Sequence, residues 1–147
     1  MNGSERFQQA LSARGIEAEV RRLADSTRTA RHAAAALGCE VGAIASSLLF
    51  FAGDEPVLVM TSGAHRVDEE LLGVRRATLD EVKAVTGYSI GGVAPIGHPT
   101  PLRTLVDTLL ESYPELWAAA GHPHAVFRTT YVELVAMTGG TPTVVGA

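Results

Sequence analysis

The stretch from residue 91 to residue 101, GGVAPIGHPTP, constrains the fold more than any other part of this chain. It holds three glycines, three prolines and one histidine in eleven residues, so neither a regular helix nor a central strand can run through it. Glycine lets backbone amides approach a ligand closely, and proline makes the loop rigid. A rigid loop with unpaired N–H groups is suited to bind an anion or a developing oxyanion. A tight connection without any ligand is the alternative interpretation.

The composition predicts one globular domain over residues 1–147, because 46% of the residues are hydrophobic and 19% are charged. The formal net charge of −4 argues against binding along a DNA duplex, but it allows contact with a short single-stranded end. No apolar run is long enough to span a membrane, and residues 1–14 are too polar for a signal peptide. The single cysteine, Cys39, fits a reducing compartment. We expect a cytoplasmic protein that is a monomer or a weak homodimer.

Local patterns predict a mixed α/β fold, in which helices surround a curved or closed sheet. The clearest signals are two capping boxes, Thr78 with Glu81 and Thr130 with Glu133, each of which begins a helix. The first of these helices should point Leu79 inward and end at Gly87. The other expected helices are 4–14, 30–37 and 67–72, a turn is expected at 25–27, and the expected strands are 16–23, 41–51, 57–61, 102–110, 116–120, 125–129 and 143–145.

Residues 87–91 match the G-x-S-x-G nucleophile elbow around Ser89. Asp107 and then His122 or His124 follow in the chain order of the corresponding catalytic triad. An elbow requires a strand before the serine and a helix after it, whereas here a capped helix precedes Ser89 and the Gly/Pro loop follows it. A serine esterase therefore stays a remote alternative.

Other polar side chains give weaker signals. His65, His98, His122 and His124 suggest a metal, but no pair has the i, i+4 spacing of a helical site, so we expect no metal and no cofactor. Asp107 lies inside an apolar run, where an unpaired charge would be costly. It either holds a loop at a strand end through backbone N–H groups or faces the Gly/Pro loop and orients a ligand or water.

Four ordered blocks of the chain together resemble the YbaK/prolyl-tRNA-synthetase-associated editing domains. Residues 91–97 look like the G-x-x-x-P loop of that family, and the other blocks are 42–50, 62–68 and 120–128 with the helix that follows. The similarity runs from about Phe7 to the C-terminus. It implies a barrel-like mixed sheet surrounded by helices. It also implies a free-standing enzyme that needs no metal and hydrolyses the ester between a wrong amino acid and the 3′ end of tRNA.

The resemblance also implies roles for individual residues. Gly91, Gly92 and Val93 would donate backbone N–H groups to the ester carbonyl or the terminal ribose, and Pro95 would keep the loop rigid. The family has a lysine in an Ile-Ala-Lys-Ser-Leu pattern, and Ser46 stands at that position here. Further candidates are Arg66 as a substitute cation, Asp107 beside the catalytic amides, and Gly97, His98, Gly121 and His124 around the pocket.

These expectations lead to a deacylase for mischarged tRNA, of the tRNA(Pro) type or for another small amino acid, whose partner is the aminoacylated acceptor end. Because Ser46 offers only a neutral hydroxyl, the alternative is a homologue with weakened catalysis that binds tRNA or an aminoacyl ester. Local phosphate-binding patches could form at Arg21-Arg22, Arg28, Arg31 and Arg75-Arg76.

Overall fold

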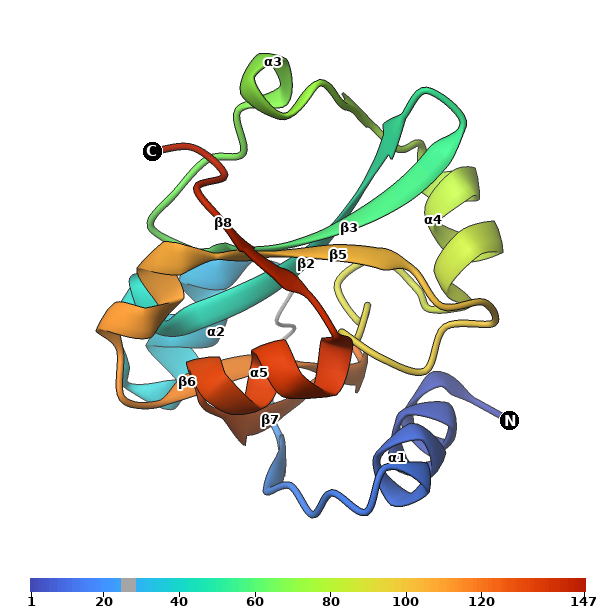
Figure 1. Ribbon diagram of the computed structural model, residues 1–147. Helices are drawn as coiled ribbons and strands as arrows, with labels where there is room; N and C mark the ends of the chain where they lie inside the picture. The colour runs from blue at the N-terminus through green and yellow to red at the C-terminus, as the bar shows by residue number, and fades with distance from the viewer. Residues whose placement is uncertain (25–28) are drawn as a thin grey trace.

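The computed structural model of the protein describes residues 1–24 and 29–147, so the turn expected at 25–27 and the side chain of Arg28 lie outside the described residues. The strands form one mixed sheet in the order β1-β7-β6-β2-β3-β5-β8, with β4 paired to β2. This sheet curls into a partly closed barrel with helices packed around it (Figure 1), which confirms the predicted fold class.

Most elements lie where the sequence predicts them. The strands are β1 (Val20–Arg22), β2 (Ile44–Ala52), β3 (Glu55–Ser62), β4 (Arg75–Arg76), β5 (Arg103–Asp107), β6 (Leu116–His122), β7 (Ala125–Thr129) and β8 (Thr141–Thr143). The helices are α1 (Gly3–Ala13), α2 (Ala30–Leu37), α3 (Glu69–Leu72), α4 (Leu79–Thr86) and α5 (Tyr131–Thr138), and two 3-10 helices are η1 (Val41–Ala43) and η2 (Thr108–Ser112).

Helix ends follow their capping residues closely. Thr78 accepts from the Glu81 N–H, and the Glu81 side chain accepts from the Thr78 N–H, so the first predicted capping box is complete. Thr130 caps α5 by accepting from the Glu133 N–H. The prediction that Leu79 points inward is wrong, because α4 packs through its C-terminal half and leaves Leu79 68% exposed.

The predicted strand at 102–110 ends early, at Asp107. The Asp107 carboxylate accepts from the Leu109 N–H at 3.0 Å and so turns the chain into η2. At the end of the chain, the last strand is two residues earlier than expected, at Thr141–Thr143, where it pairs with β5 in parallel. The short strand β4 carries too few residues for any periodicity to predict it.

The side chains of β2 alternate between the two faces of the sheet, and apolar clusters cover both faces. Ala45 and Leu49 face the larger core, which α1, α4, α5 and the loop after α4 enclose. Ile44 faces the opposite side, where it packs with Trp117 and with the alanines of α2. β2 is therefore buried on both faces, and the open space beside it lies at an interruption in its strand pairing.

Such an interruption lies along one edge of β2. Its other edge pairs with β3 from Ala45 to Ala52. On the interrupted edge, β6 pairs only with Ile44 and Ala45, and β4 pairs only with Phe50 and Phe51. Within the described part of the chain, no strand pairs with the residues between these two contacts, 46–49, on that edge.

Candidate active site

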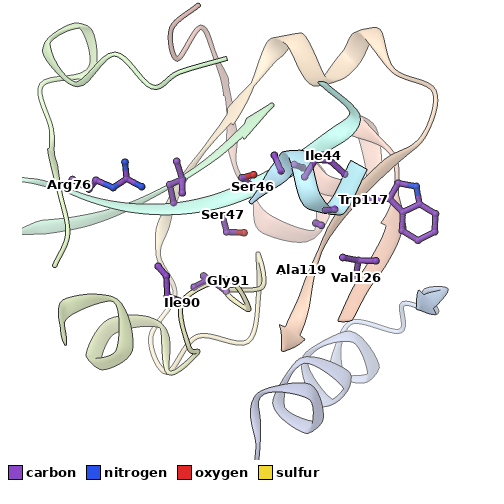
Figure 2. A pocket seen from close by; sticks show the side chains of 15 residues that line it. Ile44, Ser46, Ser47, Arg76, Ile90, Gly91, Trp117, Ala119 and Val126 are labelled. Carbon is purple, nitrogen blue, oxygen red and sulfur yellow. The ribbon is translucent and has the colours of Figure 1, made fainter. Parts of the chain in front are cut away.

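A cavity of about 220 Å³, the β2 pocket, lies at this interruption. Figure 2 shows Arg76 at one end and Trp117 at the other, with Ser46 and Ser47 of β2 between them. Its polar part is lined by Ser46, Ser47 and Arg76, together with Gly91 and Val93 of the Gly/Pro loop. Two predicted site features, the loop and the Ser46 position, are thus brought to the same cavity although they are far apart in sequence.

The rest of the wall is apolar and includes several small side chains. Ala30 and Ala33 come from α2, and Ile44, Trp117 and Val126 come from the sheet. The apolar face of α2 buries Ala33 and Ala34 against these strands.

The Gly/Pro loop reaches the pocket through a tight turn. The Gly92 N–H donates to the Ser89 carbonyl at 2.9 Å, so it is not the free donor that the sequence suggested. Gly91 has a φ of +83°, which favours glycine. Among the described residues the amides of Gly91 and Val93 have no hydrogen-bond partner, and both residues line the pocket. Two of the three predicted donors are therefore free.

Gly92 instead lets the loop approach the sheet. A Cβ at this position would lie 2.9 Å from the Cα and carbonyl carbon of His122, at the bulge of β6. Because backbone atoms cannot move away as a flexible side chain can, only glycine fits here. The position of the Gly91 and Val93 amides thus depends on the close contact between Gly92 and β6.

Two neutral hydrogen bonds hold the far side of the loop. The buried Tyr88 hydroxyl donates to the Ile96 carbonyl at 2.7 Å, and His98 Nε2 donates to the Ala94 carbonyl at 2.9 Å. Burial raises the pKa of Tyr88 to about 12, against the opposing effect of Arg6 and Arg14. Burial also lowers the pKa of His98, although its hydrogen bond to Ala94 opposes the shift. Both side chains are therefore neutral near pH 7.

Three predicted substrate-binding residues belong to this far side. Pro95, Gly97 and His98 line a separate cavity of about 170 Å³ rather than the β2 pocket. Gly97 has a φ of +86°, and a Cβ there would collide with the Tyr88 hydroxyl. In the structure these residues shape and support the loop from behind.

Replacing Tyr88 by phenylalanine should lower the free energy of unfolding by about 1–2 kcal/mol, because the buried Ile96 carbonyl loses its donor. Urea denaturation measures this loss. Tyr113→Phe is the matched control, since Tyr113 is only partly buried and the structure gives its hydroxyl no hydrogen bond among the described residues. Equal stability of wild type and Tyr88→Phe would show that this bond does not hold the loop.

Ser46 and Ser47 contribute to the pocket in different ways. Ser46 is on the face of β2 that also carries Ile44 and packs towards Trp117, and its hydroxyl has no hydrogen bond to any described residue. The Ser47 hydroxyl donates to the Met60 sulfur at 3.2 Å on the opposite face. Successive residues of a strand direct their N–H and C=O groups to opposite edges. Ala45 pairs with β6, so Ser47, two residues later, directs its N–H to the same edge, which is the interrupted one.

Arg76, rather than Arg66, is the cation at the pocket. Arg66 is exposed and does not line the cavity. Arg75, next to Arg76, forms two hydrogen bonds with Glu81 at 2.9 and 3.0 Å and covers the Phe51 ring. The hydrogen bonds from Arg75 and then from the Thr78 backbone lower the pKa of Glu81 to about 2. Within the described part of the chain, the Arg76 guanidinium has no such partner.

Asp107 is fully buried at the end of β5, away from the residues that line the pocket. Besides the Leu109 N–H, its carboxylate accepts from the Ser62 N–H at 3.0 Å and contacts His65 Nδ1 at 3.0 Å. Of the two interpretations of Asp107, this geometry matches the anchor at a strand end.

The serine-esterase triad is not assembled. Ser89 is exposed in the turn before Gly92. Asp107 contacts His65 rather than His122 or His124, and His122 Nδ1 instead accepts from the His124 N–H at 3.0 Å. His124 Nδ1 lies 3.2 Å from the Leu23 carbonyl, so this ring holds the β6–β7 turn against the segment after β1.

Gly121, which we expected around the pocket, lies instead against α1. Its φ is +91°, and its Cα is so close to the Gly3 carbonyl that a Cβ would collide with it. Among the described residues no group of three or more His, Cys, Asp or Glu side chains could hold a metal. Those residues also contain no helix that is both long and apolar enough to cross a membrane.

Sequence reasoning missed three parts of the pocket. The Arg75-Arg76 pair was noticed only as a possible phosphate patch, and nothing in the sequence separates the two side chains. Trp117 is an ordinary apolar residue of a strand in sequence, and Ala30 and Ala33 are ordinary alanines of an amphipathic helix. Strand order and helix placement alone bring them to β2.

A small pocket that combines an open strand edge with loop amides that have no partner among the described residues can bind a carbonyl compound, because such amides stabilise a developing oxyanion. The sequence model of the aminoacyl-tRNA editing domain matches residues 24–137. The chain therefore belongs to the aminoacyl-tRNA editing domain family.

Two relatives are similar to most of the chain or to part of it. The chain is 29% identical over 125 residues to the uncharacterized protein YwhH of Bacillus subtilis, covering 80% of each protein. It is 41% identical over 71 residues to the proline–tRNA ligase of Lactobacillus gasseri, covering 44% of this chain and 13% of the ligase. The match to the ligase thus concerns a small segment of that protein.

Solved structures share the fold over nearly the full length. One is a crystal structure described as a candidate trans-editing enzyme for prolyl-tRNA synthetase, with a TM-score of 0.92 and 44% identity, covering 100% of this chain and 98% of the other. Another is the hypothetical protein APE2540, with a TM-score of 0.87 and 30% identity, covering 97% and 99%.

Proposed function

We propose that this protein is a deacylase that removes a small, wrongly attached amino acid from tRNA(Pro) or a similar tRNA, and that it acts apart from the synthetase. One observation carries the proposal: Gly91 and Val93, whose amides have no hydrogen-bond partner among the described residues, line the same pocket as Ser46, the position of the family lysine. Membership of the editing family and similarity to the candidate trans-editing enzyme support it.

The reaction needs little chemistry from side chains. Water adds to the ester carbonyl, the carbonyl oxygen becomes an oxyanion, and the Gly91 and Val93 amides donate hydrogen bonds to it. The bond to the ribose 3′-oxygen then breaks, and this oxygen takes up a proton, which yields the free amino acid and the tRNA. Two fixed amides contribute on the order of 10²–10³ in rate each. The neighbouring ribose 2′-hydroxyl helps to activate the water.

The apolar wall selects the amino acid by size. Ala30, Ala33 and Ile44 line the pocket together, and we expect a methyl or hydroxymethyl side chain to fit beside them and a larger one to meet α2. Each additional methylene group changes discrimination by about 1–3 kcal/mol.

The test is a deacylation panel of tRNA(Pro) charged with Ala, Cys, Ser, Thr or Pro. We expect hydrolysis of one or more of the small aminoacyl esters and little hydrolysis of the Pro ester. No hydrolysis across the panel would refute the proposal.

Arg76 should bind substrate rather than take part in the chemical step. We expect Arg76→Ala to raise KM for aminoacyl-tRNA about 10-fold with kcat nearly unchanged, because a hydrogen bond between a guanidinium and a phosphate is lost. Arg103→Ala is the matched control, because that arginine pairs with Glu55 at 3.3 Å and is outside the pocket. A fall in kcat with unchanged KM would contradict this role.

The second candidate function is binding without efficient hydrolysis, which the serine at position 46 favours. A lysine there would supply a charge that the Ser46 hydroxyl lacks. Under this alternative, wild type binds tRNA but releases no amino acid, and Ser46→Lys restores release. Under the deacylase proposal, wild type is active and Ser46→Lys changes the rate only modestly.

A further inference from the structure

The Trp117 end of the β2 pocket carries an arrangement that the proposed chemistry does not use. The carbon at the centre of the Arg21 guanidinium lies 4.6 Å from the centre of the Trp117 ring. Arg21 Nε also donates to Glu19 at 3.0 Å, so two contacts hold the guanidinium over the indole. The guanidinium therefore covers Trp117, which is only 3% exposed, while the Arg21 side chain itself is 51% exposed.

Strand register places this stack beside the pocket. Arg21 pairs with Val126 across β1 and β7, and both Val126 and Trp117 line the pocket. Trp117 pairs with Ile44, and Ser46 is two residues further along β2, a distance of about 6–7 Å along a strand.

We propose that the outer face of the Arg21 guanidinium, held on Trp117, is the stacking platform for the unpaired terminal adenine of tRNA. Guanidinium planes and aromatic rings stack on unpaired bases, and such stacking needs no base pairing or duplex groove. The base would then lie at the Trp117 end and the ester near Gly91 and Ser46. This inference rests on the proposed function, because it assumes that the acyl group occupies the β2 pocket.

Trp117 also supplies the measurement, since it is the only tryptophan in the chain. Uncharged tRNA with an intact CCA end should change the Trp117 fluorescence on titration. The same tRNA without its terminal adenosine should bind about 10-fold more weakly, which is within the range of one stacked base. Uncharged tRNA contains no ester, so this binding is measured independently of hydrolysis.

Three variants separate stacking from charge. We expect Arg21→Ala and Arg21→Lys each to weaken binding of intact tRNA about 10-fold, because lysine keeps the charge but not the planar group. For the tRNA without its terminal adenosine, the affinity of each Arg21 variant should stay within twofold of the affinity of Arg22→Ala. Arg22→Ala, at the next exposed position of β1, is the control for a lost charge.

Wild-type affinity for Arg21→Lys, equal losses in Arg21→Ala and Arg22→Ala, or equal binding of intact and truncated tRNA to wild type would each overturn the stacking proposal. Circular dichroism checks that the variants are folded. Deacylation of charged tRNA, together with equal binding of intact and truncated uncharged tRNA, would refute the platform and leave the proposed function standing. Binding that depends on the terminal adenosine, without any deacylation, would support the platform and refute the proposed function.

Discussion

Replacing Gly92 by alanine should lower kcat/KM for deacylation by about 100-fold or more, the largest change that we expect in activity. The new Cβ would meet the His122 backbone at 2.9 Å, and neither segment can give way easily, because His122 lies in β6. The loop must therefore move, and the Gly91 and Val93 amides move with it. Overpacking of this kind also lowers the free energy of unfolding by about 1–3 kcal/mol.

Gly53→Ala is the matched control for this variant. Gly53 lies in the β2–β3 turn with a φ of +61°, and a Cβ there would meet nothing within 4 Å. It therefore should lose about 1 kcal/mol of stability from backbone strain and retain full activity per folded molecule. Single-turnover deacylation below the melting range of both variants makes the comparison. Wild-type kcat/KM in Gly92→Ala would show that the position of the loop is irrelevant to catalysis.

Replacing Asp107 by alanine should cause the largest loss of stability, about 3–5 kcal/mol in the free energy of unfolding. The change leaves the buried N–H groups of Ser62 and Leu109 without acceptors and removes the partner of His65. Asp107→Asn keeps one acceptor oxygen and should lose less. Chemical denaturation measures both variants, and Asp54→Ala in an exposed turn should stay within about 0.5 kcal/mol of wild type.

The Asp107→Asn variant also distinguishes a structural anchor from a catalytic carboxylate. Asp107 does not line the β2 pocket, so Asp107→Asn should retain deacylation within a few-fold per folded molecule at low temperature. A catalytic carboxylate predicts the opposite pattern, with a large fall in kcat and little loss of stability. That second result would return Asp107 to the chemistry and contradict the role assigned by its hydrogen bonds.

Local sequence was sufficient for features that depend on neighbouring residues. Capping by Thr78 and Thr130 follows from side chains that reach N–H groups three residues ahead, and this requires no tertiary contact. The Gly/Pro loop was predictable for the same reason. The ordered blocks around it also indicated the editing family before any coordinates.

Site residues were harder to predict, because their roles depend on which side of the loop or sheet they face. Pro95, Gly97 and His98 are in the loop as expected, but the loop has two sides, and these residues face the second cavity. Arg66 and Arg76 are both exposed arginines near the predicted pocket blocks, and only the pairing of β4 with β2 brings Arg76 to the pocket.

The sequence alone determined that this chain forms a mixed α/β fold with a rigid glycine loop, since backbone preferences and hydrophobic patterning act over a few residues. Only the tertiary structure decided which amides of that loop stay free, which arginine reaches the pocket and what Asp107 binds. The physical reason is that an N–H group is available to a ligand only when no nearby carbonyl accepts it, and those carbonyls come from packing between distant segments.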